Sequence, residues 1–269
     1  TAGGTGGHIF PAINLMKHFF GKGYQVILVT DKRGSKFINN YSEFKSYTLK
    51  VDTPTNKKIL KKIFSIFTIF RSLFRSFIII KNEKPNLIIG FGGYASFPIS
   101  YASKFFKVPL VIYENNLFLG RANRFLLSFA KKILLAKTIE KKFPEKLKNK
   151  ICKVGYILDK NIINFVNTKE KYINENFSLL VLGGSQGAEV FGKIIPFVCK
   201  MLKDRGYNIT IYQQCTKEQK DLITKYYNEN NITNHVFEFD RDVLKLMSSS
   251  NLAISRCGAS TTAELVHTL

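Results

Sequence analysis

The sequence predicts an α/β protein with two doubly wound, Rossmann-like parallel sheets, and two observations support this prediction. Short apolar runs alternate with helix-like segments along the whole chain, and Gly or Pro flanks many of these runs. Runs of this length and composition are typical of strands in parallel sheets that are covered on both faces. The predicted strands span residues 24–30, 86–91, 109–113, 132–136, 178–184, 208–213, 235–239 and 252–255.

The order of strand, glycine-rich loop and helix begins twice, which predicts two domains. A polar stretch rich in Lys and Asn, residues 156–177, separates the two beginnings. We therefore expect a first domain over residues 1–155, a linker over 156–177 and a second domain over 178–269. Sites in such sheets lie at the carboxyl ends of the strands, so two facing domains would hold a site in the cleft between them.

The composition weighs against a nucleic-acid partner and against a metal site. The formal net charge of +22 comes mostly from lysine, in a chain also rich in Asn, Ile and Phe, which indicates a general compositional bias. No nucleic-acid-binding motif accompanies the charge, although a basic surface favours diphosphates and anionic lipid. The four cysteines show no metal-ligand spacing. They are typical of reduced thiols in a cytosolic protein.

Four glycine-rich turns predict phosphate binding in both halves of the chain. They cover residues 3–8, 90–96, 183–188 and 256–264, and each precedes a predicted helix. A glycine turn lets the backbone approach a phosphate closely, and the following helix offers free N–H groups and a positive dipole end. Each turn alone is weak support, but four turns in the same context favour a phosphate ligand over simple tight-turn structure.

His8 follows the first glycine turn directly, at the start of a predicted helix. A helix N-terminus lowers the pKa of an imidazole, which leaves the ring neutral and able to accept a proton. A lone histidine in a core or at a helix cap is the ordinary alternative. The position favours a functional role for His8, as the base of a reaction or as a close partner of the base.

Two other classes of function stay open at this point. Asp31 closes a predicted strand where an acidic residue can hold a ribose, which keeps a nicotinamide-dependent oxidoreductase as an alternative. Against it, the third glycine of the dinucleotide fingerprint would fall on Ile9, and a turn residue at the strand end is the simpler interpretation of Asp31. The third class is a basic membrane-binding or nucleic-acid-binding protein without enzymatic activity.

Five motifs occur together and in order: "AGGTGGHIFPA", "GFGGYASFP", "YENN" followed by "GRANR", "VLGGSQGA" and "SRCGASTTAEL". This combination resembles the MurG family of bacterial cell-wall N-acetylglucosaminyltransferases over nearly the whole chain. The resemblance implies a two-domain GT-B enzyme that needs no metal or cofactor. In that family, GlcNAc moves with inversion from UDP-GlcNAc to the MurNAc C4 hydroxyl of lipid I, forming lipid II. The reaction implies a peripheral protein at the cytoplasmic face of the cell membrane.

The resemblance also assigns roles to residues. His8 is the expected base, and the acceptor is expected to contact Gly92, Gly93 and Tyr94. The first glycine turn would serve donor and acceptor, and the carboxylate of Glu264 suits the two ribose hydroxyls. The expected donor-binding residues are Thr5, Gly6, Gly7, Asn116, Ser185, Ala259, Ser260, Thr261 and Glu264.

The chain departs from the family pattern in its turns and at its ends. Asp159 stands where the family has a donor-contacting arginine. Either Lys160 substitutes for that arginine, or the contact with the donor is lost. Tyr113 replaces a histidine, and Asp240 replaces an apolar residue near the expected uracil pocket. The family continues before Thr1 and after residue 269. We therefore expect a fragment without its first strand and with an incomplete second domain, inactive as it stands.

Residues 59–81 predict an amphipathic helix with a basic and aromatic character. Apolar side chains recur at helical spacing, and the interspersed Lys and Arg residues exclude a clean transmembrane helix. Such a helix can lie in a membrane interface, where each Lys or Arg adds about 1 kcal/mol near anionic lipid. The alternative is an ordinary helix that packs on the sheet with snorkelling lysines. The expected membrane-contacting residues are Ile63, Phe67, Phe70, Arg71, Phe74 and Arg75.

Overall fold

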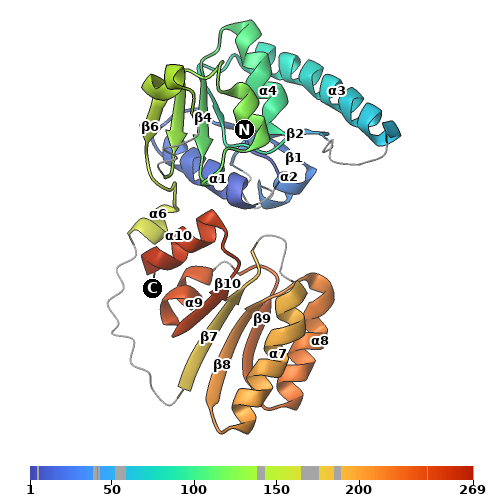
Figure 1. Ribbon diagram of the computed structural model, residues 1–269, viewed down its shortest axis with the longest axis vertical. Helices are drawn as coiled ribbons and strands as arrows, with labels where there is room; N and C mark the ends of the chain where they lie inside the picture. The colour runs from blue at the N-terminus through green and yellow to red at the C-terminus, as the bar shows by residue number, and fades with distance from the viewer. Residues whose placement is uncertain are drawn as a thin grey trace. The chain divides into compact units, whose positions relative to one another are not determined.

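The chain forms two compact units, Thr1–Ile157 and Leu158–Leu269, and each is described by itself (Figure 1). The computed structural model describes residues 1–4, 6–38, 41, 43–51, 59–137, 143–164, 176–184, 189–240 and 242–268. In the helix that begins at Ile59, side chains are described from Phe67 onward.

The first unit contains two parallel sheets. The smaller one pairs β1 (Ile27–Asp31) with β2 (Lys45–Leu49). The larger one has the order β3-β4-β5-β6 and consists of β3 (Ile88–Gly90), β4 (Leu110–Glu114), β5 (Lys132–Leu135) and β6 (Ile151–Lys153).

The first residues of the chain connect these two sheets. The Thr1 amino group donates to the carbonyl of Ile89 at 2.6 Å, and the amide of Phe91 donates to the carbonyl of Thr1 at 2.9 Å. On the other side, the amide of Ala2 donates to the carbonyl of Val29 at 3.1 Å. Residues 1–2 therefore run between β1 and β3 and hydrogen-bond to both, so the carboxyl ends of the two sheets lie next to each other.

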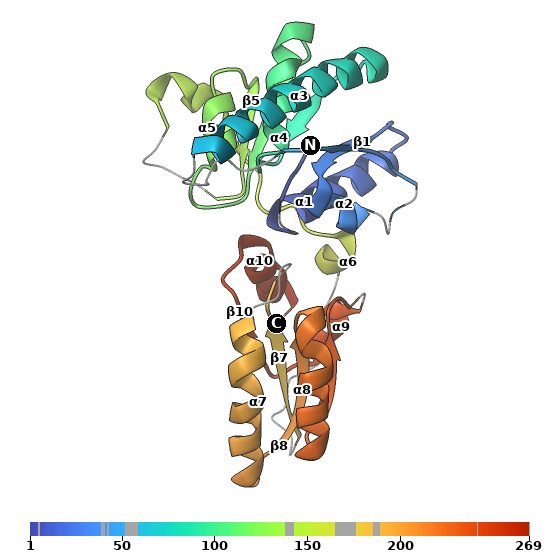
Figure 2. The same cartoon turned by 90° about the vertical axis from the view of Figure 1, so that its right-hand side faces the viewer.

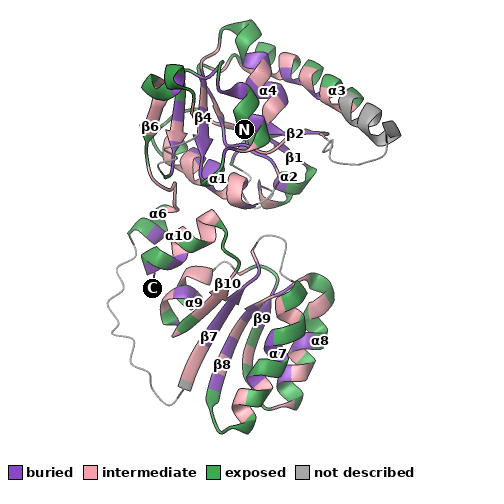
Figure 3. Cartoon of the chain, in the orientation of Figure 1, coloured by how far each residue is buried: buried purple, intermediate pink, exposed green. Residues whose placement is uncertain are grey.

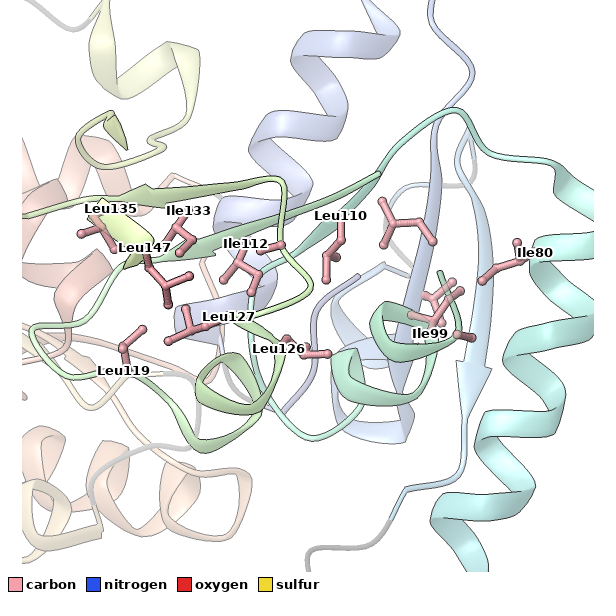
Figure 4. Packing of buried hydrophobic residues seen from close by; sticks show 14 of the residues in the cluster. Ile80, Ile99, Leu110, Ile112, Leu119, Leu126, Leu127, Ile133, Leu135 and Leu147 are labelled. Atoms are coloured by element: carbon pink, nitrogen blue, oxygen red, sulfur yellow. The ribbon is translucent and has the colours of Figure 1, made fainter. Parts of the chain in front are cut away.

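Helices of the first unit cover its sheets, and the buried apolar residues form two clusters. Helix α1 (Gly6–Phe20) buries Ile9, Ile13 and Met16, whose spacing places them on one face. Figure 4 shows the other cluster, which includes Ile80, Ile99 and residues of the large sheet such as Ile112 and Ile133. The remaining helices are α2 (Lys32–Ile38), α3 (Ile59–Glu83), α4 (Ser96–Ala102), η1 (Ser103–Phe106), α5 (Arg121–Leu126) and η2 (Glu145–Lys150).

The second unit is a single parallel sheet with helices on both faces. Its strands, in the order β10-β7-β8-β9, are β7 (Asn176–Leu182), β8 (Asn208–Gln214), β9 (Thr233–Phe237) and β10 (Leu252–Ser255). Its helices are α6 (Lys160–Ile163), α7 (Glu189–Asp204), α8 (Lys217–Glu229), α9 (Val243–Ser249) and α10 (Ala259–Thr268).

The two faces of this sheet are filled by alternate residues of β7. Leu179 and Val181 pack with residues of α7 and α8, which lie side by side in Figures 1 and 2. Leu180 and Leu182 pack with residues of α9 and α10. This alternation is the two-residue period of a strand that is covered on both faces, and Figure 3 shows the strand interior as buried.

The structure confirms the predicted fold class of two doubly wound parallel-sheet units. All eight predicted strands are present, shifted by at most a few residues. The prediction missed β2 and β6. In β2 most side chains are exposed, and β6 has only three residues, so neither presents an apolar run. Within the part of the chain that the structure describes, none of the helices has the length and apolarity that crossing a bilayer requires.

Candidate active site

Asp31 organises the first glycine turn from the carboxyl end of β1. Its Oδ2 accepts hydrogen bonds from the Gly4 amide and from Nη2 of Arg33, both at 3.0 Å. Its Oδ1 accepts from the amides of Arg33 and Gly34 at 3.0 and 2.8 Å. Burial opposes ionisation of the carboxyl, but these bonds and the Arg33 charge outweigh burial and lower the pKa of Asp31. The carboxylate thus bonds to the chain itself as a turn residue at the strand end, in agreement with the simpler interpretation of Asp31.

The first and second glycine turns touch through their backbones. The amide of Gly3 donates to the carbonyl of Gly92 at 3.2 Å. A Cβ on Gly93, whose φ is +80°, would lie 2.5 Å from the carbonyl oxygen of Gly3. A Cβ on Gly3 would lie 2.7 Å from the Cβ of Ala95. These positions require glycine because of close approach between the turns, whatever ligand they hold.

A third segment reaches the same edge from the end of β4. Glu114 is 1% exposed, and its Oε1 accepts from the amide and from Nδ2 of Asn116 at 3.1 and 2.9 Å. Its Oε2 accepts from the Gly120 amide at 2.9 Å and from Nδ2 of Asn123 at 3.0 Å. Glu114 therefore holds the segment after β4 in place. Asn116, an expected donor ligand, directs its amide nitrogen to this carboxylate.

Sequence reasoning missed the polar network around Glu114. Besides Glu114, it includes Asn123 on α5 and Asn115, whose Nδ2 donates to the carbonyl of Gly7 at 2.6 Å. The signal in the sequence was an acid and two carboxamides directly at a strand end, followed closely by a further asparagine. In the sequence alone, such a group is typical of an ordinary polar turn. Only the fold shows that it lies beside α1.

His8 lies in the first turn of α1, against the second glycine turn. A Cβ on Gly92 would lie 3.3 Å from both Cε1 of His8 and Nδ2 of Asn123. Burial lowers the pKa of His8, while the charge of Glu114 and the backbone of Phe91 oppose this effect. The direction of the shift agrees with the prediction, but its main cause is burial. Nδ1 of His8 is buried and has no hydrogen-bond partner among the described residues.

Tyr113 and Asp240, two departures from the expected pattern, have structural roles. The hydroxyl of Tyr113 donates to the carbonyl of Gly155 and accepts from the amide of Ile157, both at 3.2 Å. Burial raises the pKa of Tyr113 to about 12, so the hydroxyl stays protonated and fixes the end of the first unit. Oδ1 of Asp240 accepts a hydrogen bond from the amide of Asp242, and Oδ2 of Asp240 pairs with Nε2 of His235 at 2.7 Å.

In the second unit, the predicted donor residues Ala259, Ser260, Thr261 and Glu264 share the first two turns of α10. Oγ of Ser260 is buried and has no hydrogen-bond partner within the described ranges. Burial raises the pKa of Glu264 to about 7, and the negative charge of Asp159 adds to the effect. A negative charge thus acts on Glu264 here, where the family pattern would place an arginine.

Asp159 acts as the N-cap of α6, with Oδ1 accepting from the amide of Asn161 at 2.9 Å. Lys160 is exposed. Thr5 and Ser185, two further expected donor ligands, lie outside the described residues, as does the side chain of Ile63. The acceptor-side expectation Tyr94 is half-buried in the second glycine turn, close to the start of α4.

Among its described side chains, helix α3 has an inner face, with Phe77 and Ile80 packed in the core, and an outer face that carries exposed aromatic rings. Ser72 and Ser76 are buried, with their Oγ atoms donating to the carbonyls of Lys50 and Ser72, each at 2.7 Å. On the other face, Phe67, Phe70 and Phe74 are 64%, 67% and 69% exposed. Arg71 and Arg75 are exposed as well.

Comparisons with known proteins agree with this arrangement. The model of the glycosyltransferase family 28 N-terminal domain matches residues 1–135, and that of the C-terminal domain matches residues 178–268. A crystal structure of Acinetobacter baumannii MurG has a TM-score of 0.69 and 26% identity, over 98% of this chain and 74% of that chain. A UDP-GlcNAc 2-epimerase from Neisseria meningitidis, at 13% identity and a TM-score of 0.55, shares the fold alone.

Curated relatives are similar over nearly the whole chain. One from Rickettsia canadensis is 35% identical over 268 residues, which is 99% of this chain and 74% of the relative. One from Pelagibacter ubique is 36% identical over 271 residues, which is 98% of this chain and 73% of the relative. Both are named UDP-N-acetylglucosamine--N-acetylmuramyl-(pentapeptide) pyrophosphoryl-undecaprenol N-acetylglucosamine transferase.

Two parallel-sheet units with glycine turns at the carboxyl ends of their strands are the architecture of GT-B glycosyltransferases. The chain belongs to glycosyltransferase family 28 and, within it, to the MurG family of N-acetylglucosaminyltransferases. The predicted family and enzyme class are therefore confirmed. The alternative of a nicotinamide-dependent oxidoreductase is wrong.

Proposed function

We propose that this protein transfers GlcNAc from UDP-GlcNAc to the MurNAc C4 hydroxyl of lipid I and so forms lipid II in peptidoglycan synthesis. The observation that supports this most strongly is the similarity to relatives named for this reaction, at 35% identity over 99% of the chain. The convergence of His8 and two glycine turns at one sheet edge supports a transfer site in the first unit.

In this proposal, the first unit binds the acceptor and removes its proton. A neutral imidazole is required to accept a proton, and the lowered pKa of His8 keeps it neutral near pH 7. His8 would take the proton of the C4 hydroxyl as that oxygen attacks the anomeric carbon of GlcNAc. Gly92, Gly93 and Tyr94 would contact the acceptor beside it, and the amides at the start of α1 would face its diphosphate.

The second unit binds the donor in the same proposal. The first turn of α10 offers N–H groups and the hydroxyls of Ser260 and Thr261 to the diphosphate, which leaves as UDP. Ionised Glu264 would accept hydrogen bonds from both ribose hydroxyls. Ser185 is the further donor residue proposed in the second unit, and Thr5, Gly6, Gly7 and Asn116 are the donor-binding residues proposed in the first unit.

We also propose that the outer face of α3 binds the anionic surface of the membrane that contains the lipid acceptor. The inner face of α3 packs on the core through Leu73, Phe77 and Ile80, so the exposed phenylalanines form a second apolar face that stays mostly in solvent. Arg71 and Arg75 lie among the exposed aromatic side chains and suit anionic headgroups. This proposal gives a peripheral protein at the cytoplasmic face of the cell membrane, with no nucleic-acid partner.

The decisive experiment measures transfer of labelled GlcNAc from UDP-GlcNAc to a lipid I analogue by the full-length protein. We expect transfer by the wild type and a loss of about a hundredfold or more in kcat for His8→Ala, since general base catalysis contributes about 10²–10⁴-fold. His18→Ala is the matched control, because His18 lies at the other end of α1. A folded wild-type protein that does not bind UDP-GlcNAc would refute the function. Full transfer by His8→Ala would refute only the role of His8.

A further inference from the structure

Arg33 places a guanidinium directly against the first glycine turn. Its Nη2 donates to Oδ2 of Asp31 at 3.0 Å, the same oxygen that accepts from the Gly4 amide. A Cβ on Gly4 would lie only 3.3 Å from Nη2 and 3.7 Å from Cζ of Arg33. The guanidinium thus occupies the space beside Gly4 that a side chain at that position would fill.

This guanidinium keeps hydrogen-bonding capacity toward solvent. The Arg33 side chain is 54% exposed, whereas that of its partner Asp31 is 7% exposed. Asp31 is the one acceptor of its N–H groups among the residues that the structure describes. An arginine has several further N–H donors in a planar fork, and that fork matches the oxygens of a phosphate.

The buried ionisable groups at this edge do not supply positive charge. His8 is kept neutral by burial, and Asp31 and Glu114 are both buried, with their oxygens bonded within the chain. Apart from Arg33 and its exposed neighbour Lys32, backbone N–H groups would have to hold an anion beside two buried carboxylates. Arg33 both compensates Asp31 and presents its outer edge beside the turn, which is where a diphosphate needs a cation.

We propose that Arg33 binds the diphosphate of the polyprenyl diphosphate acceptor, held at the first glycine turn by Asp31. This inference rests on the proposed function and adds a residue to its acceptor site. A purely structural role, in which Arg33 only clamps Asp31 and the turn, is the competing explanation. The two explanations predict different results. If Arg33 only clamps the turn, its loss lowers stability and affects both substrates. If Arg33 binds the diphosphate, its loss affects binding of the acceptor selectively.

The experiment compares Arg33→Ala and Arg33→Lys in the full-length protein with Lys32→Ala. Lys32 is the matched control because it precedes Arg33 on α2, is exposed and has the same charge. We expect Arg33→Ala to raise KM for a lipid I analogue about tenfold or more, the loss typical of one charge-assisted bond. KM for UDP-GlcNAc should change less than twofold. Arg33→Lys should fall between wild type and Arg33→Ala, because lysine keeps the charge without the fork.

Inorganic pyrophosphate serves as a second probe that does not depend on turnover. Its Kd, measured by calorimetry, should rise about tenfold in Arg33→Ala and stay within twofold of wild type in Lys32→Ala. An unchanged acceptor KM with a lowered Tm would overturn the proposal in favour of the clamp. A selective rise in KM for UDP-GlcNAc would also overturn it. Absence of any GlcNAc transfer by the wild type would count against the function, while the pyrophosphate measurement would still decide the role of Arg33.

Discussion

Asn115 donates its Nδ2 to the carbonyl oxygen of Gly7 at 2.6 Å and so replaces a hydrogen bond that α1 cannot make for itself. In a regular helix, this carbonyl would accept from the amide of residue 11. Residue 11 is Pro11, which has no N–H. The end of β4 therefore completes the first turn of α1, the turn that carries His8, and links two segments that are far apart in the chain.

From this relationship we predict that Asn115→Ala destabilises the protein by about 1–3 kcal/mol, because the partly buried carbonyl of Gly7 loses its partner. Asn115→Asp should cost more, since a carboxylate has no donor and faces a carbonyl. In both variants kcat should fall, because the turn that positions His8 loosens. Urea unfolding and the transfer assay measure the two effects.

A second substitution tests the cause of that loss. Pro11→Ala restores an N–H to residue 11, so it should recover part of the stability lost in Asn115→Ala when the two are combined. Additive losses in the double variant would show that the Asn115 bond does not substitute for the missing helix bond.

The contact between the glycine turns gives a second prediction. Gly93 and Gly23 have nearly the same φ, +80° and +82°, but a Cβ on Gly93 would lie 2.5 Å from Gly3 and a Cβ on Gly23 would meet nothing within 4 Å. Gly23→Ala should therefore cost about 1–2 kcal/mol from backbone strain alone. Gly93→Ala should cost about 1–3 kcal/mol more from overpacking and should also reduce activity. Equal unfolding midpoints for the two variants would contradict this account of the turns.

The fold was predictable because most buried strands present a short apolar run, and Gly or Pro flanks many of these runs. The same reasoning missed β2, whose side chains are mostly exposed, since its pairing with β1 leaves little trace in composition. At the site, the glycine turns and His8 could be found from their local pattern. Glu114, Asn123 and Arg33 could not, because their roles depend on which strand ends lie side by side.

The orientation of α3 shows the same limit. Helical spacing predicted an apolar face, but it did not show which face points outward. Ser72 contributes to this orientation, because its hydroxyl donates to the carbonyl of Lys50, outside the helix, on the inner side. The hydroxyl of Ser76 donates to the Ser72 carbonyl one turn earlier in α3, a bond that any face of the helix allows. Without the Lys50 acceptor, Ser72 would be expected on the solvent face.

Glu264 gives a prediction about pH. Its pKa rises from 4.5 to about 7 in the folded protein, so ionisation costs folding free energy. Relative to Glu264→Gln, the wild type should lose stability as the pH rises from about 4.5 to about 7, and the difference should stay constant above that range. Tm values of both proteins between pH 4 and pH 8, without ligand, measure this. A difference that does not vary with pH would contradict the raised pKa.

The same titration affects donor binding if Glu264 holds the ribose as proposed. The carboxylate form accepts both hydroxyls, so affinity for UDP-GlcNAc should increase as the pH rises through about 7 and should lose this dependence in Glu264→Gln. Asp159→Asn should move the transition to lower pH, because it removes the negative charge that helps to raise the pKa of Glu264.

The last prediction concerns the exposed face of α3. Replacing Phe67, Phe70 and Phe74 by serine should reduce binding to anionic liposomes about tenfold or more, because each inserted phenylalanine contributes about 1.5–3 kcal/mol on full burial. Phe197→Ser is the matched control, since Phe197 is 59% exposed on α7 of the second unit. Folding should be unaffected in both proteins, as the substituted rings are mostly in solvent. Liposome sedimentation at several salt concentrations then separates the aromatic contribution to membrane binding from the electrostatic contribution. Binding that survives the triple substitution and disappears in high salt would assign the membrane contact to basic charge, and the aromatic face of α3 would have no part in it.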